Sequence, residues 1–166
     1  MAMKHYTSFS LVFLATITGL LAGGADAGEH SDNTKDLCHR ADFQPLCRSV
    51  VKGLNEPHAA LESAINQLIS HSHRAKGLAG RHGKSQNVDV CKENFDDAIF
   101  NLKTSLKNLK TRDLDSLNTN LSAALSDYVT CDDAFTESSQ NNPIGDTDTL
   151  LRHMASNCLY LSSLLK

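Results

Sequence analysis

The strongest constraint on the fold is a regular stripe of apolar residues between positions 114 and 135. Alternating steps of three and four residues separate its members: Leu114, Leu117, Leu121, Ala124, Tyr128, Cys131 and Phe135. This spacing places them on one side of an α-helix, where they can pack against neighbouring helices at shallow crossing angles. A second stripe with the same steps runs through Leu151, Met154, Cys158, Leu161 and Leu165. Both segments are therefore predicted to be helices of a bundle.

Two further apolar-striped segments precede these, so four long helices are predicted. The first is expected to begin with Asn55 as its cap and to end at Gly80, and the second begins near Ser85. Asp113 is the expected cap of the third helix, and a polar loop at 138–146 precedes the fourth. Because the connections are mostly short, we predict an all-α, up-down-up-down four-helix bundle. An intermolecular coiled coil is disfavoured by the short helices and by the breaker-rich loops.

The first 27 residues have the features of a secretory signal peptide. A weakly basic start is followed by a short apolar run at 9–21 and by small residues at 25–27, which predict cleavage before Gly28. The apolar run is too short to cross a bilayer, which takes about 20 residues. We therefore expect a secreted, extracellular protein with one domain at 28–166. Within it, residues 28–54 are predicted to form a helical hairpin and residues 55–166 the bundle.

All five cysteines follow the predicted signal peptide, and disulfides are expected in a secreted protein. Cys91 lies near the start of the second bundle helix and Cys131 near the end of the third. Both are equidistant from residue 111, where the chain is expected to turn. Residues equidistant from the turn of an antiparallel helical hairpin lie opposite one another, and both cysteines belong to apolar stripes. This geometry predicts a Cys91–Cys131 disulfide.

The remaining three cysteines are then assigned by position. Cys38 and Cys47 are close in sequence and are predicted to pair across the N-terminal hairpin. Cys158 lies between Met154 and Leu161 on the stripe of the last helix. We expect it to be a free thiol that behaves as a small buried apolar residue. The alternative is a reactive or intermolecular thiol.

Composition and motifs argue against several classes of function. The net charge is −3, and the sequence has no basic cluster with interleaved aromatic residues. Nucleic-acid binding is therefore not expected. No histidine is followed by another three or four residues later, so no helix presents a pair of metal ligands. No phosphate-binding loop or nucleophile elbow is present. We expect neither an enzyme nor a cofactor or metal protein, and no membrane partner.

A binding surface is expected on the third bundle helix, opposite its apolar stripe. Four residues share this outward side: Thr119, Ser126, Thr130 and Asp133. They are candidates for contact with a partner, although an ordinary solvated helix face would have a similar composition. Asn120 begins an Asn-Leu-Ser glycosylation sequon, but its place within a helix beside a core leucine predicts poor occupancy.

Short motifs in this order and spacing resemble those of the plant pectin methylesterase and invertase inhibitors. The motifs are Asp36-Leu37-Cys38, Phe43-Gln44-Pro45-Leu46-Cys47, Val90-Cys91-Lys92-Glu93-Asn94-Phe95-Asp96-Asp97-Ala98, Leu121-Ser122-Ala123-Ala124-Leu125, Thr130-Cys131 with Phe135, and Ser156-Asn157-Cys158-Leu159. The resemblance covers nearly all of the expected mature chain. It implies a four-helix bundle with an N-terminal helical hairpin and the same two disulfides. It also implies a cell-wall or vacuolar inhibitor that lies across the substrate cleft of its target enzyme, and Thr130 matches a recurrent family position.

The resemblance leaves the target enzyme open between two classes. Inhibitors of acid invertase often carry Pro-Lys-Phe early in the third bundle helix, where this chain has Leu114-Asp115-Ser116. We therefore expect a one-to-one complex with a pectin methylesterase, with acid invertase as the alternative target. A different class of function, an extracellular carrier of small ligands, would require a cavity between the helices.

Overall fold

The computed structural model describes residues 36–166, which contain five α-helices and no β-strand. The helices are α1 (Gln44–Val50), α2 (Pro57–Ala79), α3 (Gln86–Thr111), α4 (Leu114–Glu137) and α5 (Gly145–Ser162). The predicted all-α fold with two disulfides is therefore confirmed. The predicted signal peptide at 1–27 and the first part of the predicted hairpin, 28–35, lie outside the described residues. None of the helices within 36–166 is both long enough and apolar enough to span a membrane.

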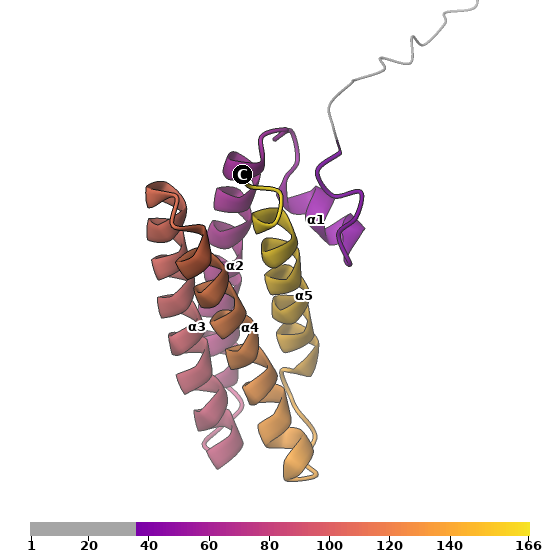
Figure 1. Cartoon of the computed structure of the whole chain (residues 1–166). Helices are drawn as coiled ribbons and strands as arrows, with labels where there is room; N and C mark the ends of the chain where they lie inside the picture. Colours follow the sequence, from indigo (N-terminus) through magenta and orange to yellow (C-terminus); the bar gives the residue numbers. More distant parts are fainter. Residues whose placement is uncertain (1–35) are drawn as a thin grey trace, which may run out of the picture. The chain divides into compact units, whose positions relative to one another are not determined.

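The four long helices form an antiparallel bundle (Figure 1). In this view α2 runs downward, α3 upward, α4 downward and α5 upward, so the predicted up-down-up-down order is confirmed. Each helix packs against two others around a ring, with α3 and α4 forming the most extensive contact. The short helix α1 lies outside this ring, against α2 and α5.

The predicted cap Asp113 is present, and Ser85, near which the second helix was expected to begin, is also a cap. The Ser85 hydroxyl accepts a hydrogen bond from the Val88 N–H at 3.3 Å, and the Asp113 carboxylate accepts one from the Ser116 N–H at 3.1 Å. Each bond satisfies an amide that has no partner within its own helix. Arg112, just before Asp113, adopts a left-handed conformation with φ of 59°. This conformation lets α3 end and α4 begin within two residues.

The predicted cap of α2 was wrong. The cap residue is Glu56, not Asn55, and its side chain makes no capping hydrogen bond. Pro57 occupies the first helical position, where its fixed φ favours the helix and its missing N–H leaves one fewer amide to satisfy. Proline at this position therefore starts the helix without a side-chain cap.

The N-terminal hairpin contains one helix within the described residues, α1, where two small helices were expected. Residues 37–40 form hydrogen-bonded turns instead. The Asp36 carboxylate accepts a hydrogen bond from the Cys38 N–H at 3.0 Å and pairs with Arg48 of α1 at 2.8 Å. The Cys38–Cys47 disulfide, with Cα atoms 5.7 Å apart, closes the same short segment. These contacts fold the chain back before a regular helix can form.

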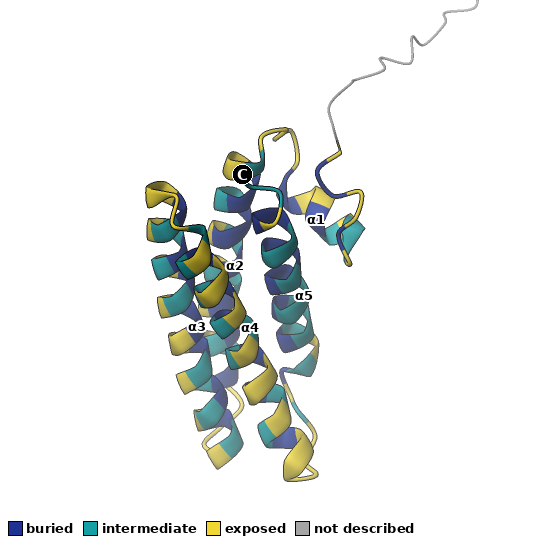
Figure 2. Ribbon diagram, viewed as in Figure 1, coloured by how far each residue is buried: buried dark blue, intermediate teal, exposed yellow. Residues whose placement is uncertain are grey.

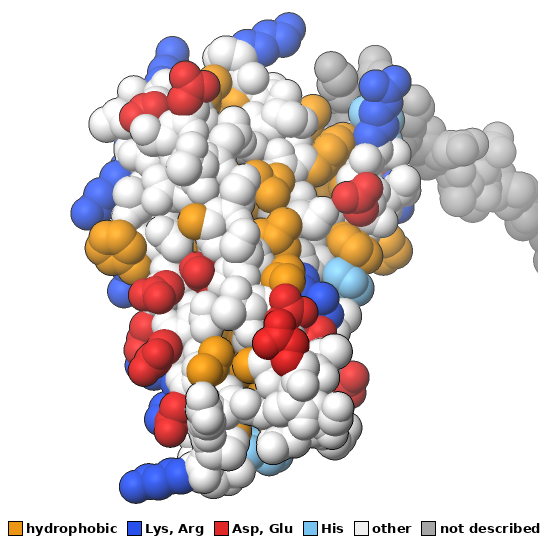
Figure 3. Space-filling model, turned by 60° about the horizontal axis from the view of Figure 1, so that its bottom comes forward, with side chains coloured by type: hydrophobic (Ala, Val, Ile, Leu, Met, Phe, Trp, Pro, Cys, Tyr) orange, Lys and Arg blue, Asp and Glu red, His pale blue; other side chains and the backbone are white. Residues whose placement is uncertain are grey.

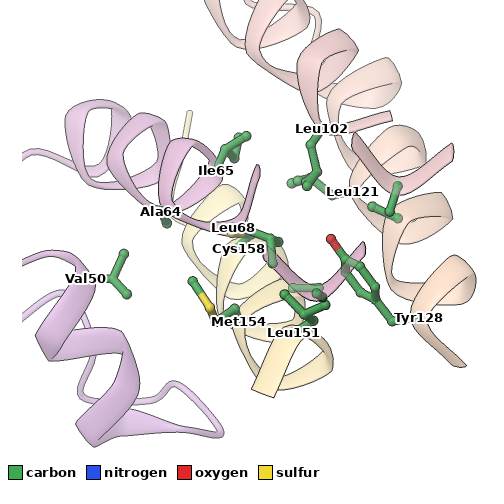
Figure 4. Packing of buried hydrophobic residues seen from close by; sticks show 14 of the residues in the cluster. Val50, Ala64, Ile65, Leu68, Leu102, Leu121, Tyr128, Leu151, Met154 and Cys158 are labelled. Carbon is green, nitrogen blue, oxygen red and sulfur yellow. The ribbon is translucent and has the colours of Figure 1, made fainter. Parts of the chain in front are cut away.

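Apolar side chains from all four long helices fill the interior of the bundle. Figure 2 shows in dark blue the buried positions along these helices. Figure 4 shows Leu68, Leu151 and Cys158 gathered near Tyr128. The Tyr128 ring is fully buried, and its hydroxyl shares a 2.6 Å hydrogen bond with that of Ser72, so this polar group is satisfied inside the core. Cys158 is a free thiol with no exposed surface, and burial raises its pKa to about 12. The thiol is therefore in its unreactive protonated form.

Candidate partner-binding surface

The candidate surface is built on α3 and α4, which are joined by the Cys91–Cys131 disulfide. The Cα atoms of the two cysteines are 4.4 Å apart, and neither side chain is exposed. The tight turn at Arg112 joins the two helices at one end of the pair, and the disulfide joins them near the other end. The two helices are therefore fixed to each other near both ends. This arrangement prevents α3 and α4 from sliding past one another.

The four candidate residues from the sequence are all exposed on α4. The hydroxyls of Thr119, Ser126 and Thr130 each donate to the carbonyl oxygen four residues earlier, at 2.9, 3.1 and 2.9 Å. Because these hydroxyls are bonded to the helix itself, they lie flat against it. The outer side of α4 is therefore a smooth strip of small side chains, with Asp133 near its C-terminal end.

A surface groove lies between the beginning of α3 and the end of α4. It has a volume of about 580 Å³, and Gln86, Val90, Thr130 and Asp133 are among the residues that line it. The structure thus brings Thr130 and Asp133 together with residues of α3 in one concave site. Thr119 and Ser126 lie outside the groove, further along α4 toward the turn that joins the two helices.

The half of this pair that contains the groove is acidic, with two of its carboxylates, Asp96 and Asp132, paired to Lys76 of α2 and Arg152 of α5. Residues 86–101 and 122–137 carry one lysine, Lys92, and eight acidic residues: Asp89, Glu93, Asp96, Asp97, Asp127, Asp132, Asp133 and Glu137. Figure 3 shows acidic side chains gathered over the lower part of the face that is turned toward the viewer. Burial, and secondarily the charge of Asp97, raises the pKa of Asp127, against a 3.0 Å hydrogen bond from Asn101 that lowers it. A cationic surface is the natural complement of such a region.

Phe100 is an exposed residue on this surface that the sequence analysis did not identify. Its side chain is 69% exposed, more than that of any other large hydrophobic residue among those described. It follows Ala98 of the apolar stripe by two residues, which places it about 200° around the helix from the core. That offset could have been read from the sequence. Its neighbour Ile99 is only about 100° from the stripe and is buried, so the stripe itself distinguishes the two adjacent residues.

The side chains of this surface offer features that a protein partner could contact. Within residues 36–166, no three histidine, cysteine, aspartate or glutamate side chains come together in an arrangement that could hold a metal ion. The described free thiol is buried in the core, away from the groove. What the face offers to a partner is its shape, its negative charge and the exposed ring of Phe100.

Asn120 is expected to remain unglycosylated despite its sequon. Its side-chain amide, the group to which a glycan would be attached, is half-buried and donates to the Ser116 carbonyl at 2.8 Å. Glycosylation would remove this bond and place a bulky sugar beside the buried Leu121. The intact mass of the protein, expressed with its N-terminal segment in plant cells, should not change after treatment with an N-glycosidase. An Asn120→Gln variant serves as the control, and a mass loss confined to the unmodified sequence would contradict this expectation.

Comparison with known proteins identifies the family. The family described as plant invertase/pectin methylesterase inhibitor matches residues 32–161. Pectinesterase inhibitor 12 of Arabidopsis thaliana is 36% identical over 83 residues, which is 46% of this chain and 48% of that protein. The match thus spans about half the length of this curated relative.

Two solved structures share the fold. A mutant form of a pectin methylesterase inhibitor from Arabidopsis superposes with a TM-score of 0.69 at 16% identity, covering 78% of this chain and 95% of that one. A pectin methylesterase inhibitor from Arabidopsis thaliana gives a TM-score of 0.63 at 16% identity, covering 82% and 98%. The family and the named relative are inhibitor proteins, not enzymes. This chain belongs to the plant invertase/pectin methylesterase inhibitor family.

Proposed function

We propose that this protein is secreted, binds a plant pectin methylesterase in a one-to-one complex and occludes its substrate cleft. Inhibition of this kind limits the de-esterification of pectin in the cell wall. Residues 1–27 act as the signal peptide, and residues 28–166 form the inhibitor domain. The observation that carries the proposal is the disulfide-fixed, acidic α3–α4 face, in a chain whose family consists of inhibitors.

The rigidity and charge of this face both support binding to an enzyme. A surface that is already ordered loses little conformational entropy when it binds, so more of the contact energy appears as affinity. The substrate, pectin, is a polymer of galacturonic acid whose free carboxylates are negatively charged. The acidic face of the inhibitor repels such a polymer, so the enzyme and not the polysaccharide is its expected partner.

The start of α4 supports pectin methylesterase over acid invertase as the target. Leu114-Asp115-Ser116 forms the first turn of this helix, and the backbone N–H of Ser116 donates to the Asp113 cap. Inhibitors of invertase often carry Pro-Lys-Phe at about this place. The named relative with 36% identity over 83 residues is also an inhibitor of the pectinesterase type.

The packing of the helices argues against the third function, a small-ligand carrier. An internal cavity lined by residues of α1, α2 and α5, including Val50, Ala64 and Leu161, holds only about 10 Å³. Ligand pockets usually measure roughly 300–1,000 Å³. A larger hollow of about 610 Å³ lies near the C-terminus, but it is open to solvent and partly lined by the charged Asp36 and Glu56. Neither site resembles an enclosed apolar pocket.

Steady-state kinetics test the occlusion mechanism. If the inhibitor covers the cleft, increasing concentrations should raise the apparent KM of the esterase for pectin and leave kcat unchanged. Size-exclusion chromatography with light scattering should show a complex of one inhibitor and one enzyme. A fall in kcat at constant KM would indicate binding elsewhere on the enzyme, and the absence of a complex would contradict the proposal.

Replacement of Thr130 by arginine is expected to weaken inhibition at least tenfold, because a long cation would fill the groove that Thr130 lines. The control is Thr136→Arg, at another exposed threonine of the same helix that does not line the groove. Both variants should unfold at the same temperature as the unmodified protein. Equal inhibition constants for the two variants would show that Thr130 is not part of the binding surface.

A further inference from the structure

Phe100 is unusual among the exposed residues of this protein. The other exposed large hydrophobic side chains within residues 36–166 are Leu54 and Val129, each 37% exposed, whereas the Phe100 ring is 69% exposed. Exposed aliphatic residues are common on protein surfaces. A nearly free aromatic ring at the centre of a long, well-packed helix calls for a specific explanation, because the same position would accept a polar residue without disturbing the core.

The neighbours of Phe100 along α3 divide by charge. One turn toward the start of the helix lie Asp96 and Asp97, and one turn toward its end lies Lys103. Asp96 is held by Lys76 of α2, whose ammonium group lies 2.6 Å from one carboxylate oxygen. Asp97 is on the opposite flank, close enough to Asp127 of α4 to raise its pKa. The ring therefore stands at the edge of the acidic half of the α3–α4 pair.

The register of the disulfide indicates what lies across from Phe100 on α4. Cys91 is opposite Cys131, and the helices are antiparallel, so Phe100 is level with Ser122. The α4 residues at this level that turn outward are small, and Ser126 keeps its hydroxyl bonded to its own helix at 3.1 Å. Phe100 therefore projects beyond a flat neighbourhood with no large side chain on α4 to cover it.

We propose that Phe100 is the apolar anchor of the inhibitory surface and inserts into a recess of the target enzyme whose rim is positively charged. This inference rests on the proposed function and specifies the chemistry of its partner. Aromatic residues are enriched among the few side chains that carry most of the energy of a protein interface. Asp97 and the other unpaired acidic residues of this half of the pair attract the cationic rim during the encounter, whereas the ring slows dissociation once it is seated.

The test measures association and dissociation rates of the purified protein on an immobilised plant pectin methylesterase. Phe100→Ala should raise the dissociation rate at least tenfold and leave the thermal unfolding temperature unchanged, because the ring has little contact with the core. Phe100→Tyr keeps the ring and should remain within about threefold of the unmodified protein. Leu54→Ala and Val129→Ala, which shorten the other exposed hydrophobic residues, are the matched controls and should have no effect.

Salt separates the roles of the ring and of the charges. The association rate of the unmodified protein should fall about tenfold between 50 and 500 mM NaCl, and Phe100→Ala should show the same dependence. If the unmodified protein binds the esterase and Phe100→Ala dissociates at the same rate, Phe100 is not the anchor. The proposed inhibitor function would not be affected by that result. An association rate that does not depend on salt would contradict the proposal that the rim of the recess is positively charged. If the unmodified protein binds no pectin methylesterase, the proposed function and this inference both fail.

Discussion

Replacement of both Cys91 and Cys131 by alanine is expected to lower the free energy of unfolding by about 4 kcal/mol. The bridge joins residues 40 positions apart, and in the chain-entropy model a closed loop of this length restricts the unfolded chain by that amount. Removal of the shorter Cys38–Cys47 bridge, with a separation of 9 residues, should cost roughly 3 kcal/mol. Urea-induced unfolding of the two double variants and of the unmodified protein provides the comparison.

The two double variants should differ more in inhibition than in stability. Loss of the Cys91–Cys131 bridge frees α3 and α4 to shift relative to each other, so the binding face is no longer ordered before contact. Loss of Cys38–Cys47 loosens a segment on the far side of the bundle, against α2 and α5. We therefore expect weaker inhibition from the first variant and nearly normal inhibition from the second, at temperatures where both are folded. Unchanged potency of the Cys91/Cys131 variant would show that the face does not depend on this bridge.

A rise in pH from 5 to 7 is expected to reduce the stability contributed by Asp148 by about 2 kcal/mol. This carboxylate is completely buried on α5, and neither of its oxygens has a hydrogen-bond partner among the described residues. The nearest cation is the Arg152 guanidinium, whose Nε lies 3.5 Å away and which also pairs with Asp132 of α4 at 3.3 Å. Burial, opposed by Arg152 and reinforced by Asp132, raises the pKa of Asp148 to about 7.

The direction of the effect follows from proton binding. Between the ordinary aspartate pKa of 3.8 and the folded value of about 7, the native protein holds a proton on Asp148 that the unfolded chain has released. Stability therefore falls by about 1.4 kcal/mol per pH unit across that interval and levels off above it. The stability that Asp148 contributes is complete in acid and is lost as the pH rises through 7.

Substitution of Asp148 by asparagine isolates this contribution. The amide is neutral at every pH and nearly the same size, so Asp148→Asn should lose the fall in unfolding free energy between pH 5 and 7. Asp146→Asn, at an exposed position of the same helix, should retain it. Burial lowers the pKa of His71, which gives a pH dependence of opposite sign that all three proteins share. Parallel stability profiles for Asp148→Asn and the unmodified protein would contradict the assignment.

Helix positions could be predicted because the apolar stripes and two of the caps are local features. Ser85 and Asp113 each precede a stripe and have a side chain that can accept a hydrogen bond from a backbone amide. The starts of α3 and α4 could therefore be predicted. Asn55 has the same chemistry, but the proline two residues later defines the start of α2. The Cys91–Cys131 pairing could be inferred because an antiparallel hairpin with a tight turn fixes which residues face each other.

Features that depend on the packing of several helices could not be read from the sequence. Asp148 continues the stripe of α5, three residues before Leu151, but an acid at that position is normally expected at the surface. Its burial depends on how closely α4 and α5 approach, which no local pattern records. The exposure of Phe100 is a different case, because its offset of about 200° from the stripe of α3 is a local feature that the sequence analysis overlooked.

The most direct test of the account is a titration of the purified protein against a plant pectin methylesterase and an acid invertase, side by side at about pH 5.5. We expect saturable inhibition of the esterase that is complete near one equivalent, and no inhibition of the invertase. Inhibition of the invertase alone would contradict the assigned target and show that the lack of Pro-Lys-Phe does not discriminate between the two classes. A protein that inhibits neither enzyme, across several isoforms of each, would contradict the inhibitor function itself.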